Sequence, residues 1–199
     1  MKPLLKICGV TNAAFACEAE HLGANYLGFI FAPGTPRAVT PEKAREIREH
    51  LSRRVRCVGV FVHQTPVDIL SIVRAVGLDI VQLHRRATAE EIHALQAAGL
   101  EVWSLAGGAL GEGVLFDSSH GDGETTFHKG PFKSILAGGI SAANLSEALA
   151  HSPDVIDVSS SLESSLGVKS IPLLQNFMRT WQRCRDSVPF APDEVDGRT

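Results

Sequence analysis

Short apolar segments alternate with amphipathic segments along most of the chain. Eight runs rich in Val, Ile, Leu and Phe are predicted to be strands, near residues 4–8, 25–31, 55–62, 78–83, 100–105, 114–117, 133–137 and 155–158. Nearly every position in these runs is apolar, which is typical of parallel strands that are buried on both faces. The pattern therefore predicts a parallel sheet at the centre of the molecule, covered by other elements.

Amphipathic segments with recognisable ends lie between many of these strands. We predict helices over residues 12–22, 41–51, 66–76, 88–98, 142–151 and 171–184. Their expected N-terminal caps are hydroxyl side chains, namely Thr11, Thr40, Thr65, Thr88 and Ser141. Eight strands interleaved with helices favour a closed α/β barrel of the (β/α)8 or TIM type. An open doubly wound sheet is the alternative, but no GxGxxG motif follows the first strand.

Two connections depart from this alternation. Residues 106–113 join the fifth and sixth predicted strands with only eight residues, four of them glycine, and residues 118–132 lack helical periodicity. Parallel neighbours usually need a connection of about a dozen residues or more, most often a helix. We therefore expect a trimmed barrel, with the helices after strands five and six absent or replaced by short loops. The outer faces of these two strands would then be uncovered, and such an apolar face suggests a homodimer contact.

The chain length fits one domain. Residues 1–184 are predicted to form a single (β/α)8 barrel domain. Residues 185–199 contain two prolines and four acidic residues, and we expect them to form a disordered C-terminal tail.

Composition excludes several classes of function. A net charge of −3 and a pI near 6.2 argue against nucleic acid or an anionic membrane as the main partner. No apolar run has transmembrane length and no signal peptide precedes the first strand, so we expect a cytoplasmic protein. The scattered cysteines are predicted to be free thiols, at Cys8, Cys17, Cys57 and Cys184. No HExxH or CxxC motif indicates a metal site.

Glycines and hydroxyl side chains follow the last two predicted strands. Gly138 and Gly139 come directly after strand seven, and Asp157, Ser159 and Ser160 lie at the end of strand eight. In barrels of this type the loops after these strands commonly bind phosphate, because glycine lets backbone N–H groups approach the anion closely. A glycine turn beside an ordinary polar loop is the alternative interpretation.

Ionisable side chains end several other strands. Cys8 ends strand one and Asp117 ends strand six, so both are candidates for proton transfer, although Cys8 could be a small buried apolar residue and Asp117 a turn cap. Arg37, in the loop after strand two, could bind a substrate carboxylate. Gln82 and His84 alternate at the end of strand four and can face the same side. No GxSxG nucleophile motif is present.

Seven short segments resemble the phosphoribosylanthranilate isomerase family of tryptophan biosynthesis in order and approximate spacing, between about residues 4 and 180. They are Lys6–Thr11 (KICGVT), Leu27–Phe31 (LGFIF), Thr35–Arg37 (TPR), Val58–Val62 (VGVFV), Val81–His84 (VQLH), Leu136–Gly139 (LAGG) and Asp157–Ser160 (DVSS). The resemblance implies a cofactor-independent Amadori rearrangement. In that reaction N-(5-phosphoribosyl)anthranilate becomes 1-(2-carboxyphenylamino)-1-deoxyribulose 5-phosphate.

The resemblance also implies roles for the candidate residues. Cys8 would be the general base that removes the ribose C2 proton, and Asp117 the general acid that protonates the ring oxygen. Arg37 would hold the anthranilate carboxylate. The phosphate would be held by Gly138, Gly139, Ser159 and Ser160, with Asp157 beside them. Because a thiol acts as a base only when ionised, we expect the surroundings of Cys8 to lower its pKa.

The chain differs from the family pattern at a few positions. Arg85 and Ser161 stand where the family usually has glycine, and Leu166 stands where it usually has proline. Asp122 and Glu124 add negative charge to the loop after strand six. These differences leave two alternatives, namely a paralogous isomerase of another phosphorylated aminoribose and a non-catalytic barrel that binds a phosphorylated ligand.

Overall fold

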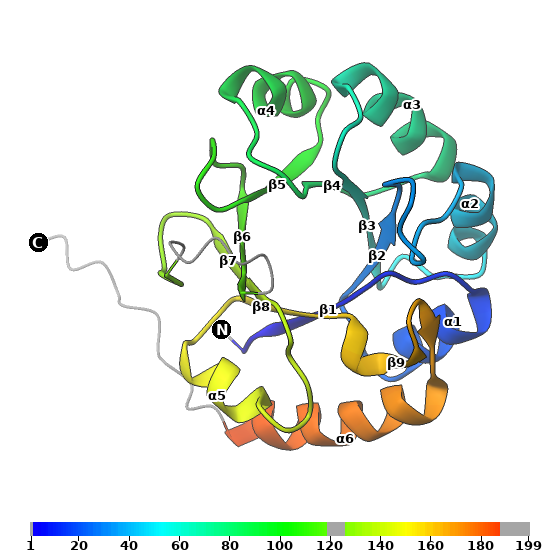
Figure 1. The fold of residues 1–199 in the computed structure, drawn as a ribbon, viewed down its shortest axis with the longest axis vertical. Coiled ribbons are helices and arrows are strands. Elements are labelled where there is room, and N and C mark those ends of the chain that lie inside the picture. The colour runs from blue at the N-terminus through cyan, green and yellow to red at the C-terminus, as the bar shows by residue number, and fades with distance from the viewer. Residues whose placement is uncertain (1, 119–125, 188–199) are drawn as a thin grey trace, which may run out of the picture.

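The computed structural model describes residues 2–118 and 126–187, which contain a closed barrel of eight parallel strands (Figure 1). The strands follow each other around the barrel in chain order: β1 (Leu4–Cys8), β2 (Tyr26–Ile30), β3 (Arg56–Phe61), β4 (Ile80–Leu83), β5 (Glu101–Leu105), β6 (Gly113–Asp117), β7 (Lys133–Ala137) and β8 (Val155–Val158). β1 pairs with both β2 and β8, so the sheet closes on itself. The predicted (β/α)8 barrel is confirmed.

Helices surround the barrel (Figure 1). They are α1 (Ala13–His21), α2 (Pro41–Glu49), α3 (Pro66–Val76), α4 (Ala89–Gln96), α5 (Leu145–Ala150) and α6 (Ile171–Ser187). No helix connects β5 to β6, and the described residues between β6 and β7 contain none either. The predicted trimming of the barrel is therefore observed in the part of the chain that the structure describes.

Three of the predicted helix caps are confirmed. The side chains of Thr40, Thr65 and Thr88 each accept a hydrogen bond from the backbone N–H three residues later. Thr65 and Thr88 also form capping boxes, in which Asp68 and Glu91 bond back to the cap. These helices start where the sequence predicts because the cap interaction is local.

Two predicted caps are wrong. Helix α1 is capped by Asn12 rather than Thr11, since the Asn12 side chain accepts a hydrogen bond of 2.8 Å from the Phe15 N–H. Ser141 instead donates its N–H to the Asn144 side chain at 2.7 Å, which forms a turn after β7. Helix α5 therefore begins only at Leu145.

The outer faces of β5 and β6 are covered, which contradicts the prediction that they are exposed. The outward side chains Val102, Ser104, Val114 and Phe116 are all buried. Connection 106–112 lies directly on β5: the Gly111 N–H donates to Ser104 Oγ at 3.1 Å, and backbone oxygen of Val102 leaves no room for a side chain at position 111. The homodimer predicted through these strands thus lacks the exposed apolar face on which it depended.

Aromatic side chains cover β6 in the same way. The rings of Phe127 and Phe132 lie 5.1 Å and 6.3 Å from the Phe116 ring, centre to centre. These three side chains belong to a small apolar cluster on the outside of the barrel. Extended chain with aromatic residues thus takes the place of a covering helix.

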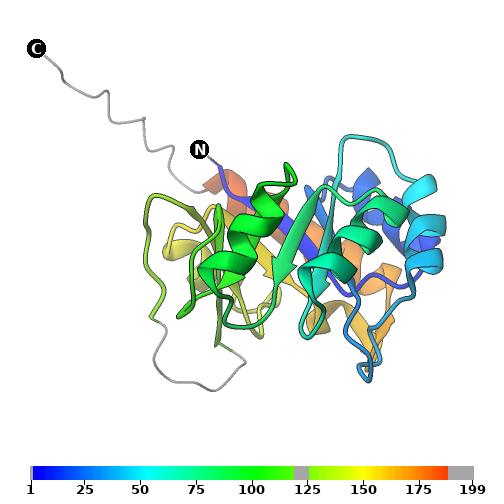
Figure 2. The same cartoon turned by 90° about the horizontal axis from the view of Figure 1, so that it is seen from above.

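A short hairpin after β8 is absent from the sequence prediction. The 3₁₀ turn η2 (Ser160–Leu162) leads into β9 (Glu163–Ser165), which pairs antiparallel with β10 (Val168–Lys169). Figure 2 shows this hairpin, in gold, beside the blue β2–α2 connection at one end of the barrel. Gly167, at a φ of +80°, packs against the backbone oxygen of Pro36 in that connection.

The C-terminal boundary of the barrel lies slightly later than predicted. Helix α6 continues to Ser187, so residues 185–187 are helical rather than part of a disordered tail. Residues 188–199, which make up the rest of the predicted tail, lie outside the described residues. None of the helices in the described part of the chain combines the length and hydropathy that a membrane crossing requires.

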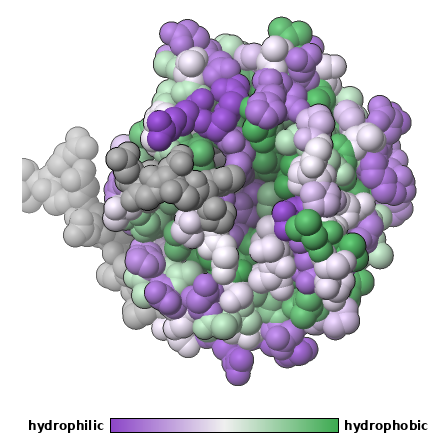
Figure 3. All heavy atoms as spheres, in the orientation of Figure 1, coloured by the Kyte–Doolittle hydropathy of each residue, from purple (hydrophilic) through white to green (hydrophobic). Residues whose placement is uncertain are grey.

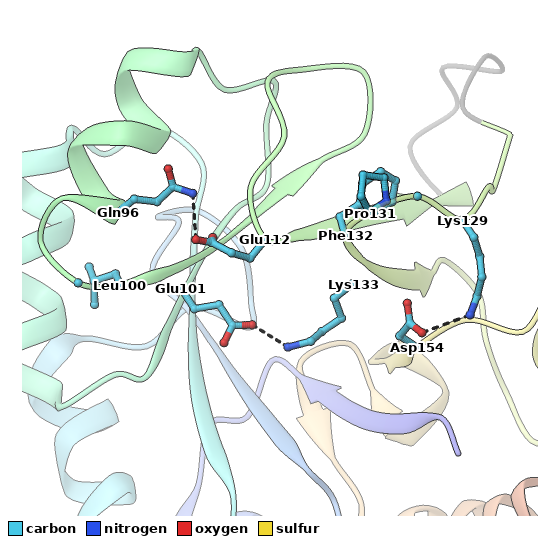
Figure 4. A pocket seen from close by; sticks show the side chains of 11 residues that line it. Gln96, Leu100, Glu101, Glu112, Lys129, Pro131, Phe132, Lys133 and Asp154 are labelled. Atoms are coloured by element: carbon cyan, nitrogen blue, oxygen red, sulfur yellow. Dashed lines mark hydrogen bonds and ion pairs between the residues drawn. The ribbon is translucent and has the colours of Figure 1, made fainter. Parts of the chain in front are cut away.

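A charged network lies at the amino-terminal end of the barrel, and Figure 4 shows the ion pair between Glu101 and Lys133 that belongs to it. Glu101 accepts hydrogen bonds from Lys133 Nζ at 2.7 Å, Trp103 Nε1 at 2.7 Å and Arg56 Nη1 at 2.6 Å. Burial alone would raise the pKa of Glu101, but these three hydrogen bonds outweigh it and lower the pKa to about 2. The ionised carboxylate therefore ties β3, β5 and β7 together.

We predict that Glu101→Gln destabilises the fold by about 1–3 kcal/mol at neutral pH, because two charge-assisted hydrogen bonds lose their charged acceptor. A lowered pKa means that the stabilisation is present above the ordinary glutamate pKa and is lost as the pH falls toward about 2. The difference in unfolding free energy between the two proteins should therefore shrink below pH 4.5, as measured by urea denaturation. Glu147→Gln, at an exposed position on α5, is the control. A difference that does not change with pH would contradict this account.

Candidate active site

A cavity of about 510 Å³ lies at the carboxyl-terminal end of the barrel. Figure 3 looks onto this face, which is hollowed near its centre. The cavity is lined by all ten residues that the sequence singled out: Cys8, Arg37, Gln82, His84, Asp117, Gly138, Gly139, Asp157, Ser159 and Ser160. The structure thus brings together groups from β1, β4, β6, β7 and β8 and from the loop after β2.

Cys8 points into the barrel from the end of β1 and is only 9% exposed. Gly28 on β2 makes room for it, since a Cβ at position 28 would lie 2.9 Å from Cys8 Sγ and 3.3 Å from Lys6 Cε. Burial raises the pKa of the Cys8 thiol, and the nearby cations Lys6 and Lys169 reduce this effect without reversing it. The expectation that the surroundings lower this pKa is therefore wrong, because loss of water around the sulfur outweighs the positive charges.

A buried ion pair lies beneath the thiol. Lys6 Nζ donates to Asp157 Oδ2 at 2.6 Å, and both side chains are almost completely buried. Burial acts to lower the pKa of Lys6, but the Asp157 carboxylate raises it above its ordinary value, so the lysine is charged. Sequence reasoning missed Lys6, although a lysine two residues before Cys8 in an otherwise apolar strand must share its inward face.

Arg37 reaches the cavity but is already engaged by another residue. Its Nε and Nη2 donate to Glu163 Oε1 and Oε2 at 2.7 Å and 2.9 Å. Lys169, which is fully buried, donates to Glu163 Oε1 at 2.9 Å and to the backbone oxygen of Ser159 at 2.9 Å. Neither Glu163 nor Lys169 was predicted. The available signal was two charged residues of opposite sign, six positions apart, after the serines of β8.

Three polar side chains face one another across the rim between β4 and β6. Gln82 Nε2 lies 3.5 Å from His84 Nδ1, and His84 Nε2 lies 3.9 Å from Asp117 Oδ2. Gln82 is buried, and its Oε1 has no hydrogen-bond partner among the described residues. The alternation at the end of β4 therefore does place Gln82 and His84 on one side, as predicted.

The loop after β7 contains two consecutive glycines in the left-handed region, and it lines the same cavity as the serines that follow β8. Gly138 and Gly139 have φ angles of +92° and +62°, which side-chain-bearing residues rarely adopt. No atom lies within 4 Å of the position that a Cβ on Gly139 would take, so the space beside it is open. Across this space Ser159 donates its hydroxyl to the Cys8 backbone oxygen at 3.1 Å, which links the loop to the end of β1.

Three of the positions that differ from the family pattern do not line the cavity. Arg85 donates to both oxygens of Glu91 at 2.6 Å and 2.7 Å and does not line the cavity. The Ser161 hydroxyl is buried without a hydrogen-bond partner in the described chain, and it does not line the cavity either. Leu166 is exposed in the turn of the hairpin, and the predicted acidic positions Asp122 and Glu124 lie outside the described residues.

No cluster of three metal-ligating side chains occurs among the described residues. For proton transfer the cavity offers the thiol of Cys8, the carboxyl group of Asp117 and the imidazole of His84. For an anion it offers the glycines after β7 and the serines after β8. Its ionisable residues include Lys6, Arg37, Asp117, Asp157, Glu163 and Lys169, counting those directly behind its wall.

Comparison with known proteins connects this geometry to a family. The family model of N-(5′-phosphoribosyl)anthranilate isomerase matches residues 5–180. The enzyme of that name from Lacticaseibacillus casei strain BL23 is 33% identical over 187 residues, which cover 88% of this chain and 93% of the relative. The one from Granulibacter bethesdensis is 30% identical and covers 87% of this chain and 95% of its own length.

Solved structures give the same result. The phosphoribosylanthranilate isomerase of Thermus thermophilus superposes with a TM-score of 0.79 at 32% identity, covering 90% of this chain and 98% of its own. A second such enzyme, solved in complex with reduced 1-(o-carboxyphenylamino)-1-deoxyribulose 5-phosphate, has a TM-score of 0.79 at 28% identity and covers 91% and 99%. The chain therefore belongs to the N-(5′-phosphoribosyl)anthranilate isomerase family.

Proposed function

We propose that this chain isomerises N-(5-phosphoribosyl)anthranilate to 1-(2-carboxyphenylamino)-1-deoxyribulose 5-phosphate in tryptophan biosynthesis. The observation that carries the proposal is the cavity in which Cys8, Asp117 and the glycine turn of β7 converge. Relatives that align with almost the whole chain bear the name of this enzyme. The substrate is thus a small phosphorylated molecule. We also propose a cytoplasmic location, which the free thiols at all four cysteines support.

The first step opens the sugar ring. Asp117 donates its proton to the ring oxygen, the bond between that oxygen and C1 breaks, and the anthranilate nitrogen forms a double bond to C1. The positive charge on this nitrogen then makes the proton on C2 acidic. Asp117 suits the role because it ends β6 at the cavity wall, where its side chain is only 11% exposed.

The second step moves the proton from C2. The Cys8 thiolate removes it, the electron pair forms a double bond between C1 and C2, and the nitrogen regains its lone pair. The resulting enolamine takes a proton at C1 and loses one from the C2 hydroxyl, which gives the ketone. Overall, one hydrogen moves from C2 to C1 and one proton moves from the C2 hydroxyl to the former ring oxygen, so atoms and charges balance without any cofactor and both Asp117 and Cys8 return to their starting states.

The two anionic ends of the substrate fix its orientation. We assign the phosphate to the turn of Gly138 and Gly139 and to Ser159 and Ser160, because these groups line the cavity and can offer backbone N–H and hydroxyl donors to an anion. The anthranilate carboxylate is assigned to Arg37, which lies beyond Cys8 from that turn along the β2 loop. Gln82 and His84 line the rim beside Asp117, where they contact the middle of the substrate.

We predict that Cys8→Ser and Asp117→Asn each lower kcat by about 10²–10⁴-fold, which is the usual contribution of a proton-transfer group. Loss of phosphoribosylanthranilate fluorescence measures the rate. Cys184→Ser, which changes a thiol on α6 outside the cavity, should retain wild-type turnover. Binding of the reduced product analogue without turnover by the wild-type chain would contradict the proposed function and indicate a non-catalytic phosphate-binding barrel.

The raised pKa of Cys8 gives a prediction about pH. In the ligand-free protein, little of Cys8 should be thiolate at pH 7, and the thiolate fraction should rise only above the ordinary thiol pKa of about 8.5. The rate at which iodoacetamide alkylates Cys8 should follow this fraction. Peptide mass spectrometry separates Cys8 from the half-buried thiols of Cys17 and Cys184, which serve as internal references. Half-maximal labelling of Cys8 at a pH below the ordinary thiol pKa of about 8.5 would contradict the burial argument.

A further inference from the structure

The carboxylate of Glu163 is the shared partner of two cations on opposite sides of it. Arg37 approaches it through Nε and Nη2, and Lys169 approaches through Nζ, all within 2.9 Å. The Gly167 N–H adds a fourth hydrogen bond at 3.0 Å. Burial alone would raise the pKa of Glu163, but these donors lower it to about 2, so the residue is ionised at any physiological pH.

We infer that Glu163 is a positioning residue for the substrate, which holds the carboxylate-binding Arg37 and the phosphate-binding Ser159 loop at a fixed separation. The inference rests on the proposed function, because it takes the anthranilate carboxylate as the ligand of Arg37 and the phosphate as the ligand of the Ser159 loop. Glu163 itself does not line the cavity and acts only through its two cationic partners.

At one end, Glu163 determines which edge of Arg37 is offered to the ligand. The arginine stem lies over Gly9, where a Cβ would be 3.0 Å from Arg37 Cδ. Glu163 occupies the Nε and Nη2 edge, and in the described chain no carboxylate occupies Nη1. An incoming carboxylate therefore meets the end of the guanidinium at Nη1 and Nη2. Arg37 therefore does not present its Nε and Nη2 edge to a substrate carboxylate, because Glu163 already binds that edge.

At the other end, Glu163 acts through Lys169. The lysine donates to the backbone oxygen of Ser159 at 2.9 Å and lies 3.2 Å from its hydroxyl. Ser159 in turn donates to the Cys8 backbone oxygen at 3.1 Å. Burial lowers the pKa of Lys169, while the hydrogen bond to Glu163 acts to raise it. Glu163 thus keeps a buried cation in place behind the phosphate loop.

Charge explains why a carboxylate can lie so close to a site for an anionic ligand. Arg37 and Lys169 carry two positive charges against the one negative charge of Glu163, so the cluster keeps a net positive charge toward the cavity. A glutamine would keep the size of the side chain but would leave two adjacent cations without a counter-charge. Arg37 would then lose its fixed orientation, and ordering it again would cost binding energy.

The chain contains a matched control. Arg85 and Glu91 also form a two-bond ion pair, here through Nη1 and Nη2 at 2.7 Å and 2.6 Å, but they lie outside the cavity. A merely structural role for Glu163 would make Glu163→Gln behave like Glu91→Gln, with a loss of stability and no change in ligand affinity.

The test measures kcat, KM and the affinity for the reduced product analogue by calorimetry. We expect Glu163→Gln to raise KM and the dissociation constant of the analogue about tenfold or more, with a smaller change in kcat, whereas Glu91→Gln changes neither by more than about twofold. Glu163→Asp, which keeps the charge, should lose less affinity than the glutamine variant. It also serves as the second variant if Glu163→Gln does not fold, in which case the aspartate variant should still bind the analogue more weakly than the wild type.

A double-mutant cycle with Arg37→Met separates positioning from a general effect. In the Arg37→Met background, Glu163→Gln should add much less to the dissociation constant than it does alone, because its main partner is already gone. Fully additive effects, or unchanged KM and affinity in Glu163→Gln, would overturn the inference. The proposed function and the role of Glu163 are tested by different results. A wild-type chain that binds the analogue but does not turn over the substrate refutes the function. The analogue affinities of the wild type and the Glu163 variants still decide the role of Glu163.

Discussion

The ion pair between Lys6 and Asp157 spans the seam at which the first and last strands close the barrel. The two residues are register partners on β1 and β8, and their side chains meet in the interior at 2.6 Å. Buried charges are costly unless they are paired, so any slip in this register would leave two uncompensated charges in an apolar core. The pair thus favours a single alignment, and that alignment also places Cys8, at the end of β1, beside Ser159, the first residue after β8.

The interior of the barrel has three levels with different chemistry. Glu101 and its cationic partners occupy the amino-terminal end, and an apolar layer that includes Tyr26, Trp103 and Ile135 fills the middle. The cavity with its thiol and carboxyl group occupies the carboxyl-terminal end. Because inward positions recur every second residue, the same strand can contribute to more than one level, as β5 does with Glu101 and Trp103. Rigid strands therefore set the spacing of the reactive groups.

Much of this arrangement could be predicted from the sequence because it depends on local patterns. Strand positions follow apolar runs, three helices begin at threonine caps, and the cavity residues follow strand ends. What could not be predicted depends on tertiary burial. The pKa of Cys8 is set by desolvation in the closed barrel. Glu163 and Lys169 meet Arg37 only because a hairpin folds back over the β2 loop. The outer face of β5 is covered by a short loop that was expected to leave it exposed.

That connection, residues 106–112, bears on how short a barrel of this kind can be. The usual length of a parallel crossover reflects the need to cover the sheet as much as the need to travel back along it. Here a glycine at position 111 lets main chain lie against main chain, so a short irregular segment covers the strand in place of a helix. Other crossovers in designed barrels could therefore be shortened by placing a glycine where the returning backbone meets the strand. A chain that forms such a barrel can then be shorter than eight complete strand–helix repeats would require.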